Sequence, residues 1–318
     1  MPAPRRLLLC AGLLLCTPLV GSLRAQPFPA PRDSVTARLM QRLATLSADS
    51  MEGRRTGTPG SARARAWIVQ QLEAMGARPA AGALEMPFMF RGRGTAAGDS
   101  TAGVNIIARI PGRTSGGPVL VLSAHYDHLG VRNGEVFNGA DDDASGCVAI
   151  LTIAERLLKD PPQHDVIVAF FDAEEMGLQG ARAFVNAPPV PLASIAANLN
   201  LDMVARQDAG TLWVSGTSHY PFLKPLAEAA SKASGVAVRF GHDTKDLKPG
   251  DDWTGSSDHG AFHGKGIPFL YLGVEDHPDY HKSGDDAAKV DPAFYRSSVE
   301  FAAALVRRLD AALGTFAR

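Results

Sequence analysis

The chain of 318 residues is poor in cysteine, with only three of these residues. Cys10 and Cys16 lie in an apolar N-terminal segment, so removal of that segment would leave Cys147 alone. A single cysteine excludes an internal disulfide. About 290 residues would remain, which is enough to bury a full apolar core without cross-links. Cys147 itself falls in an apolar helical stretch, and we expect it to be a buried small side chain.

The sequence also lacks a basic block and a second apolar run of membrane-spanning length. Its 32 basic and 33 acidic residues give a net charge of −1. Residues 1–25 hold three arginines and no acid, so the remainder carries 29 basic and 33 acidic residues, a charge of −4. We therefore expect no nucleic-acid partner and no stable membrane insertion after loss of this segment.

The N-terminal segment itself has the layout of a secretory signal peptide. Arg5 and Arg6 precede an apolar run from Leu7 to about Val20, and the small residue Ala25 follows. The run is short for a membrane span. Residues 1–25 are therefore predicted to be a signal peptide of a secreted or periplasmic protein, with an uncleaved anchor as the alternative.

Helical and strand patterns alternate along the rest of the chain. Residues 33–47 and 61–75 carry apolar residues at helical spacing, and "EMPFMF" resembles a strand. From residue 104, buried-strand runs alternate with helical stretches: "VNIIARI", "PVLVLSA", "DVIVAFFD", "IAANLNLDM" and "IPFLYLG", with helices at 144–158, 180–185, 221–234 and 293–313. We predict an α/β fold with a mostly parallel sheet covered by helices on both faces. Residues 26–103 would pack on a catalytic core of 104–318.

Histidines and carboxylates follow the predicted strands. Open α/β sheets form their sites beyond the carboxyl ends of the strands. These positions hold the following residues: His125 and Asp127, Glu174 and Glu175, Asp202, and Tyr280 and His281. Between the first two groups stands "NGADDDASG", residues 138–146, with three adjacent aspartates that repel one another unless a cation lies between them. We predict a metal site on this rim.

Each of these groups has an ordinary interpretation when it is taken alone. A lone histidine is more often a satisfied polar residue, and acids at a helix start favour the helix dipole. Adjacent aspartates do not have the alternating spacing of an EF-hand loop, and no HExxH helix is present.

Two imidazoles with three or four carboxylates exceed the three protein ligands of one catalytic zinc. They suit two metals that share a carboxylate.

At this point the motifs resemble a known family. "SAHYDHLG", "NGADDDASG", "FFDAEEMGLQGARAF", "NLDM" and "SSDHGAFHGKGIPFLYLG" with the later "DYHKSGDD" are similar to the M28 peptidases, a di-zinc aminopeptidase family. The resemblance runs from about Val104 to Asp291, and "DSMEGRRTGTPG" resembles the family's N-terminal region. It implies a zinc-exopeptidase-like α/β/α sandwich and two Zn²⁺ ions.

The resemblance also implies a role for each matched residue. His125 and Asp202 would bind one zinc, Glu175 and His281 the other, and Asp142 would bridge them. Glu174 would be the general base for a water held between the zincs. The remaining matches are supporting groups: Asp127 to orient His125, Asp285 to support His281 similarly, Tyr280 to stabilise the reaction intermediate, and Asp258 near the substrate or only in a polar loop.

Several features remain outside this assignment. His128 follows a strand end and is not expected to be a ligand, and His259, His263 and His277 match no ligand position. Asp143 is expected to cap or position the following helix, whereas Asp141 has no assigned role. Residues 242–255 form a polar insertion that could border the substrate.

The function predicted from this resemblance is that of a secreted aminopeptidase acting on peptides with a free N-terminus. A glutaminyl-cyclase-like aminoacyl transferase shares the fold but needs one zinc. A carboxypeptidase or dipeptidase would need a basic side chain for a terminal carboxylate, with Arg182 and Lys282 as candidates. A binding module that had lost the chemistry should lack ligands or the base, and this chain keeps Glu174 and all five expected ligands.

Overall fold

The computed structural model describes Met1 and residues 33–91, 100–206, 210–248 and 250–316. Apart from Met1, the predicted signal peptide, with Cys10 and Cys16, lies outside the described residues. Within the described part, no helix combines the length and the apolar character that a membrane crossing requires.

A nine-stranded mixed sheet forms the centre of the described structure, in the order β1-β3-β7-β4-β8-β11-β9-β10, with β2 paired to β3. Its core strands are β3 (Thr101–Ile110), β4 (Val119–His125), β7 (Val166–Phe171), β8 (Ile195–Leu201) and β11 (Phe269–Gly273). The pairs β4–β7, β4–β8 and β8–β11 are parallel, and β3–β7 is antiparallel. The other strands are β1 (Arg78–Pro79), β2 (Glu85–Phe90), β9 (Leu212–Ser215) and β10 (Val238–Phe240).

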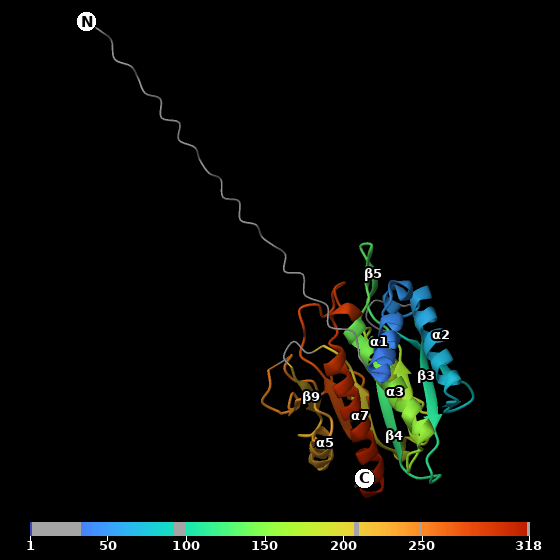
Figure 1. The fold of residues 1–318 in the computed structure, drawn as a ribbon. Helices are drawn as coiled ribbons and strands as arrows, with labels where there is room; N and C mark the ends of the chain where they lie inside the picture. The colour runs from blue at the N-terminus through green and yellow to red at the C-terminus, as the bar shows by residue number, and fades with distance from the viewer. Residues whose placement is uncertain (2–32, 92–99, 207–209, 249, 317–318) are drawn as a thin grey trace.

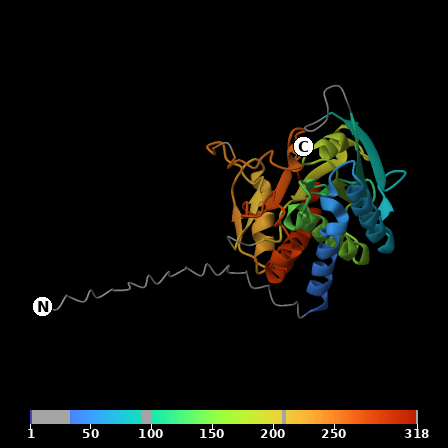
Figure 2. The same cartoon turned by 90° about the horizontal axis from the view of Figure 1, so that it is seen from above.

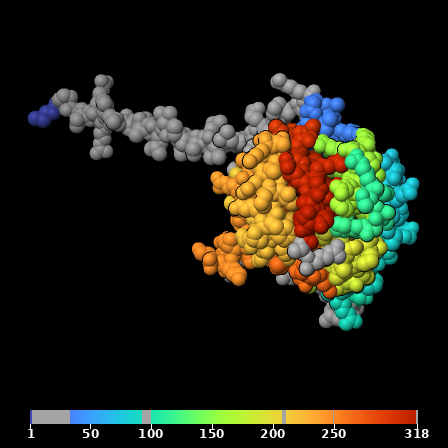
Figure 3. Space-filling model, turned by 90° about the horizontal axis from the view of Figure 1, so that it is seen from below, coloured from blue at the N-terminus to red at the C-terminus, as the bar shows by residue number. Residues whose placement is uncertain are grey.

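Helices cover both faces of this sheet (Figures 1 and 2). One face packs against α1 (Ser34–Leu46), α2 (Pro59–Ala74), α3 (Gly146–Lys159), α5 (Lys224–Ser231) and α7 (Pro292–Ala312). The other face packs against α4 (Gln179–Asn186) and α6 (His259–His263). In the space-filling view from below, the red C-terminal segment lies between orange and green segments, in agreement with the contacts of α7 with α5 and α3 (Figure 3).

The apolar runs form buried strands because successive side chains point to opposite faces. In β7, Val166 and Val168 enter the core beneath α3, whereas Ile167 and Ala169 face α4 and α6. Both sets are fully buried. This arrangement confirms the predicted α/β class with a mostly parallel sheet between helical layers.

The N-terminal helices and strands join the same sheet as the rest of the chain. β2 pairs antiparallel with β3, which spans the proposed division at residue 104. The division into segments stays a prediction. Helix α1 begins after Asp33, whose carboxylate accepts the Val35 and Thr36 N–H groups and caps the helix.

Three details depart from the expected elements. The helix expected over 221–234 is the short 3₁₀ turn η4 (Pro221–Leu223) followed by α5. The short strands β9 and β10, and a hairpin of β5 (Gly130–Arg132) and β6 (Glu135–Phe137), were not predicted, since three or four residues carry too little periodicity. The aspartate stretch forms a single irregular turn, η2 (Ala140–Ser145), before α3.

Candidate metal and catalytic site

The site lies at the carboxyl ends of the parallel strands. His125 is the last residue of β4, and Asp202 directly follows β8. Glu174 and Glu175 come three and four residues after β7 ends at Phe171. The site borders a cleft of about 930 Å³, in whose lining His125, Glu174 and Asp202 take part with Tyr280 and His281. The structure thus brings the predicted rim residues to one place.

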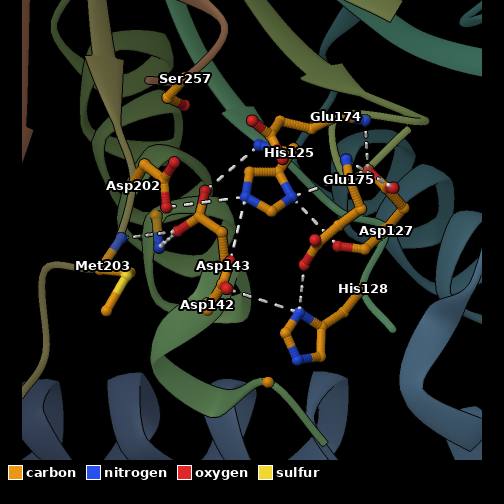
Figure 4. Close-up of polar contacts among 12 residues, drawn as sticks. His125, Asp127, His128, Asp142, Asp143, Glu174, Glu175, Asp202, Met203 and Ser257 are labelled. Atoms are coloured by element: carbon orange, nitrogen blue, oxygen red, sulfur yellow. Dashed lines mark hydrogen bonds and ion pairs between the residues drawn. The ribbon is translucent and has the colours of Figure 1, made fainter. Parts of the chain in front are cut away.

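Asp142 stands between two groups of ligand atoms (Figure 4). Its Oδ1 lies 3.2 Å from His125 Nε2, which is 3.6 Å from Asp202 Oδ1. Its Oδ2 lies 3.1 Å from His281 Nε2, which is 3.4 Å from Glu175 Oε2. The two oxygens of one carboxylate therefore face two separate clusters.

These separations fit metal ions. Zinc bonds of about 2.0–2.2 Å in a tetrahedron place neighbouring N and O ligand atoms roughly 3.3–3.5 Å apart. The groups His125–Asp142–Asp202 and His128–Asp142–Glu175 each offer ligand atoms within 4.8 Å of one another. Imidazole and carboxylate donors suit zinc and other divalent transition metals. The residues present fit a zinc site on each side of Asp142.

The charges in the clusters shift the acidities of their members. Burial alone would lower the pKa of His125, but the Asp202 and Glu174 carboxylates raise it well above its usual value. Burial likewise opposes protonation of His281, yet hydrogen bonding to Asp142 and Glu175 raises its pKa to about 10. Burial would raise the pKa of Asp142, but the nearby histidines hold it well below its usual range. The site is thus built to hold positive charge.

Asp127 connects His125 to the glutamate pair. Its backbone carbonyl lies 3.1 Å from His125 Nδ1, and its Oδ1 lies 3.6 Å from the same atom. Its carboxylate also accepts the N–H groups of Glu174 at 3.0 Å and Glu175 at 3.4 Å. Asp127 therefore fixes the His125 ring through its backbone carbonyl and the backbone of Glu174 through its carboxylate.

Glu174 has a carboxylate free of protein partners. Among the described residues, no hydrogen bond or ion pair reaches it, and it faces the cleft. Burial raises its pKa well above the usual value, and although His125 opposes this shift, the carboxylates of Asp258 and Asp202 add to it. A carboxyl group with a raised pKa is a stronger base than an exposed glutamate.

The three adjacent aspartates have separate contacts. Asp143 accepts the N–H groups of His125, Gly146 and Met203, so its carboxylate joins β4, the start of α3 and the end of β8. Its contact with Gly146 agrees with the expected positioning of this helix. Asp141, which had no expected role, accepts the Ala205 N–H at 2.7 Å.

Asp285 lies behind the aspartate turn. Its carboxylate accepts the backbone N–H groups of Asp141 and Asp142 at 3.0–3.1 Å. Among the described contacts none joins it to His281, which it was expected to support. Asp285 instead holds the backbone of Asp142, the predicted bridging ligand.

Arg54 fixes the same turn from the other side. It is fully buried, and its five N–H groups donate to five backbone carbonyls. The acceptors are the carbonyls of Leu46, Tyr126, Asn138, Gly139 and Asp142. The sequence predicted no role for Arg54 beyond its place in the motif "DSMEGRRTGTPG", because its partners lie up to 88 positions away along the chain.

Tyr280 and Asp258 have different surroundings near the predicted ligands. The Tyr280 ring stacks on His281 with centroids 4.0 Å apart, and burial with the nearby Asp142 charge raises the pKa of its hydroxyl. Asp258 is fully buried, and neither carboxylate oxygen has a hydrogen-bond partner among the described residues. Burial raises the pKa of Asp258 to about 8, although His125 opposes the shift.

The cleft wall includes part of the insertion at 242–255. Asp251 and Trp253 line it, as does Arg182. The Trp253 ring stacks on His242 at 3.8 Å, and His242 Nε2 lies 3.0 Å from Glu275. Lys282, the other candidate for binding a terminal carboxylate, donates to the Pro278 carbonyl and is absent from the described lining of the cleft.

The sequence model of peptidase family M28 matches residues 105–306. Aminopeptidase YwaD of Bacillus subtilis is 32% identical over 155 residues, which cover 47% of this chain and 30% of that protein. The chain spans less than half the length of the curated relatives that it matches.

Solved structures share the fold. An aminopeptidase from Aneurinibacillus sp. strain AM-1 superposes with a TM-score of 0.69 at 17% identity, covering 85% of this chain and 93% of that one. The glutaminyl cyclase of Porphyromonas gingivalis gives 0.68 at 20% identity, covering 85% and 97%. At these identities the likeness shows the fold alone.

Proposed function

The chain belongs to peptidase family M28, and from this premise we propose that it is a secreted metalloaminopeptidase that hydrolyses N-terminal peptide bonds with two zinc ions. One observation carries the proposal. The two oxygens of Asp142 face two ligand clusters, and the unpartnered Glu174 carboxylate lies beside them in the cleft.

The proposed ligands divide between the two clusters. His125 and Asp202 would hold one zinc, Glu175 and His281 would hold the other, and Asp142 would contribute to both. Bound zinc ions supply positive charge that polarises the scissile carbonyl and lowers the pKa of the attacking water. Asp127 orients the His125 ring and Asp285 fixes the Asp142 backbone, as their hydrogen bonds support.

Glu174 is the proposed general base. Its carboxylate takes a proton from the attacking water and passes it to the leaving amine. The hydrogen bond from its N–H to Asp127 ties the base to the His125 ligand, so both keep one relative position. Tyr280 retains its hydroxyl proton and donates a hydrogen bond to the reacting carbonyl oxygen, a role that its raised pKa supports.

The charge of the cleft favours a substrate with a free α-amine. Among the described residues, its lining contains seven carboxylates and one arginine, Arg182. Two divalent cations would balance four of the seven negative charges. The three carboxylates outside the ligand and base positions (Asp251, Glu275 and Asp276) would attract an ammonium group and repel the terminal carboxylate that a carboxypeptidase must bind.

The proposed location rests on the N-terminal sequence. The Arg5–Arg6 pair, the apolar run and Ala25 support export to the periplasm or the medium. N-terminal sequencing of the protein recovered from outside the cytoplasm should begin near residue 26. Recovery of the intact N-terminus would refute cleavage.

The test of function is Glu174→Gln, assayed on aminoacyl chromogenic substrates and on N-terminally blocked peptides. Because a general base contributes about 10²–10⁴-fold, kcat should fall by that factor while metal content stays at two ions per chain. Glu73→Gln, at an exposed position of α2, controls for the substitution and should leave both quantities unchanged. Metal loss in the Glu174 variant would make this residue a ligand instead of the base.

The substrate panel also separates the competing activities. Cleavage of blocked peptides without cleavage of free-amine peptides would refute the aminopeptidase and favour a carboxypeptidase that uses Arg182. Release of ammonia from N-terminal glutamine without peptide hydrolysis would instead favour a glutaminyl cyclase activity. The glutaminyl cyclase of Porphyromonas gingivalis has the same fold as this chain.

A further inference from the structure

His128 lies at the Glu175 side of the site, although no sequence pattern indicated that it is a ligand. Its Nδ1 is 2.8 Å from Glu175 Oε1 and 3.6 Å from Asp142 Oδ2 (Figure 4). The ring thus points at the atoms that face the second cluster. His281 approaches the same carboxylates, and the two imidazoles meet edge to face with centroids 5.9 Å apart.

The ring nitrogens of His128 are buried and make no hydrogen bond in the described structure. The side chain is 1% exposed, and neither ring nitrogen has a hydrogen-bond partner among the described residues. Glu175 Oε1 is also buried without a hydrogen-bond partner, despite its short distance from Nδ1. Buried polar atoms are nearly always paired, so these atoms indicate a partner that is a bound ion.

The backbone leaves space for this ring at Gly139. Gly139 has φ = +53°, and a Cβ built there would lie 2.5 Å from His128 Cδ2 and 2.6 Å from Cγ. Any side chain at Gly139 would therefore collide with the His128 ring and with the Asp142 carbonyl. The turn that carries Asp142 is shaped to receive this imidazole.

We propose that His128 Nδ1 is a further ligand of the metal held by Glu175 and His281. The inference rests on the proposed function. It makes the two sites unequal, because four side chains (Asp142, Glu175, His281 and His128) hold one metal and three (His125, Asp142 and Asp202) hold the other. A site with three protein ligands keeps a position for water or substrate, whereas four protein ligands close a tetrahedral zinc site. The His128 site is therefore the tighter one and fills first.

The test removes His128 and measures zinc affinity by competition with a chromophoric chelator. Loss of a group that only orients a ligand costs about 10–100-fold in affinity, so loss of a direct ligand in His128→Ala should weaken the first binding step by about 100-fold or more. His164→Ala is the matched control. His164 is a buried histidine at the opposite end of the sheet, paired with Asp310, and its removal should leave zinc affinity unchanged.

A second variant separates binding from orientation. His128→Asn places an amide near the position of Nδ1, where it can donate a hydrogen bond to Glu175 but binds zinc poorly. It should lose as much affinity as His128→Ala. Wild-type affinity in His128→Asn would overturn the inference, because hydrogen bonding alone would then suffice.

X-ray absorption at the zinc edge, or a crystal structure of the zinc-loaded wild type, tests the ligand directly and needs no variant. The inference expects three imidazoles over two zinc ions. Two imidazoles in an active two-zinc enzyme would overturn it and leave the proposed function intact. A wild-type chain that bound fewer than two metals would refute the proposed function itself, and the inference with it.

Discussion

Arg54 provides a sharp test of how the turn bearing Asp142 is held. The five N–H groups of its buried guanidinium donate to five carbonyls, three of which belong to Asn138, Gly139 and Asp142. Arg54→Lys keeps the positive charge, but an ammonium group has only three donors. At least two of the five carbonyls must therefore lose their partner.

The expected cost follows from these lost contacts. A buried acceptor left without a hydrogen bond costs about 1–3 kcal/mol, so two of them should lower the free energy of unfolding by ~2–6 kcal/mol. Most domains are stable by only about 5–15 kcal/mol, so the variant should lose a large part of its stability. Because the freed carbonyls include that of the central ligand, zinc affinity should fall as well.

The measurement is urea-induced unfolding of the metal-free protein, with zinc affinity determined separately. Arg63→Lys is the control, since Arg63 is partly exposed, bonded to the Ser50 carbonyl and paired with Glu52 at 2.8 Å. Such a surface contact is worth about 0–1 kcal/mol. A loss below about 1 kcal/mol in Arg54→Lys, or equal losses in both variants, would refute the reasoning.

Two further predictions concern single carboxylates. Asp142→Ala should abolish binding of both zincs together, because its oxygens face different clusters, and a metal count showing one site at full occupancy would contradict this. Burial and the nearby Asp127 charge raise the pKa of Asp172 to about 6, so its contribution to stability is complete below about pH 4 and is lost as the pH rises through about 6. The side chain of Asp172→Asn stays neutral at every pH, so this variant does not lose that contribution. With metal removed by a chelator, the free energy of unfolding of the variant minus that of the wild type should increase by ~3 kcal/mol between about pH 4 and 7. A pH-independent difference would rule this out.

Much of the architecture was predictable because it depends on local pattern. The apolar runs became β3, β4, β7, β8 and β11, since a strand buried on both faces needs apolar residues at most of its positions. Histidines and carboxylates follow the ends of the predicted strands, and this was enough to predict that they gather on one rim of the sheet. From the sequence, only the family resemblance could indicate which of the three adjacent aspartates bridges the two metals.

The tertiary structure decided which polar groups meet. Asp285 was expected at His281, yet it holds the backbone of Asp141 and Asp142, because a loop after a strand can turn its carboxylate in several directions. His128 was set aside because nothing in its neighbourhood in sequence tells whether an imidazole points into the site. Arg54 gained its contacts through partners up to 88 positions away.

The sequence by itself determined the fold class and the chemical types that gather at the strand ends, because burial and strand periodicity are local properties of the chain. Only the folded chain decided how the three aspartates share their tasks: Asp141 accepts the Ala205 N–H, Asp142 faces both clusters, and Asp143 joins β4 to α3. The direction in which each of these neighbouring side chains points is set by the backbone dihedral angles of this one turn. Those angles are fixed by Arg54 and Asp285, which reach the turn from distant parts of the chain.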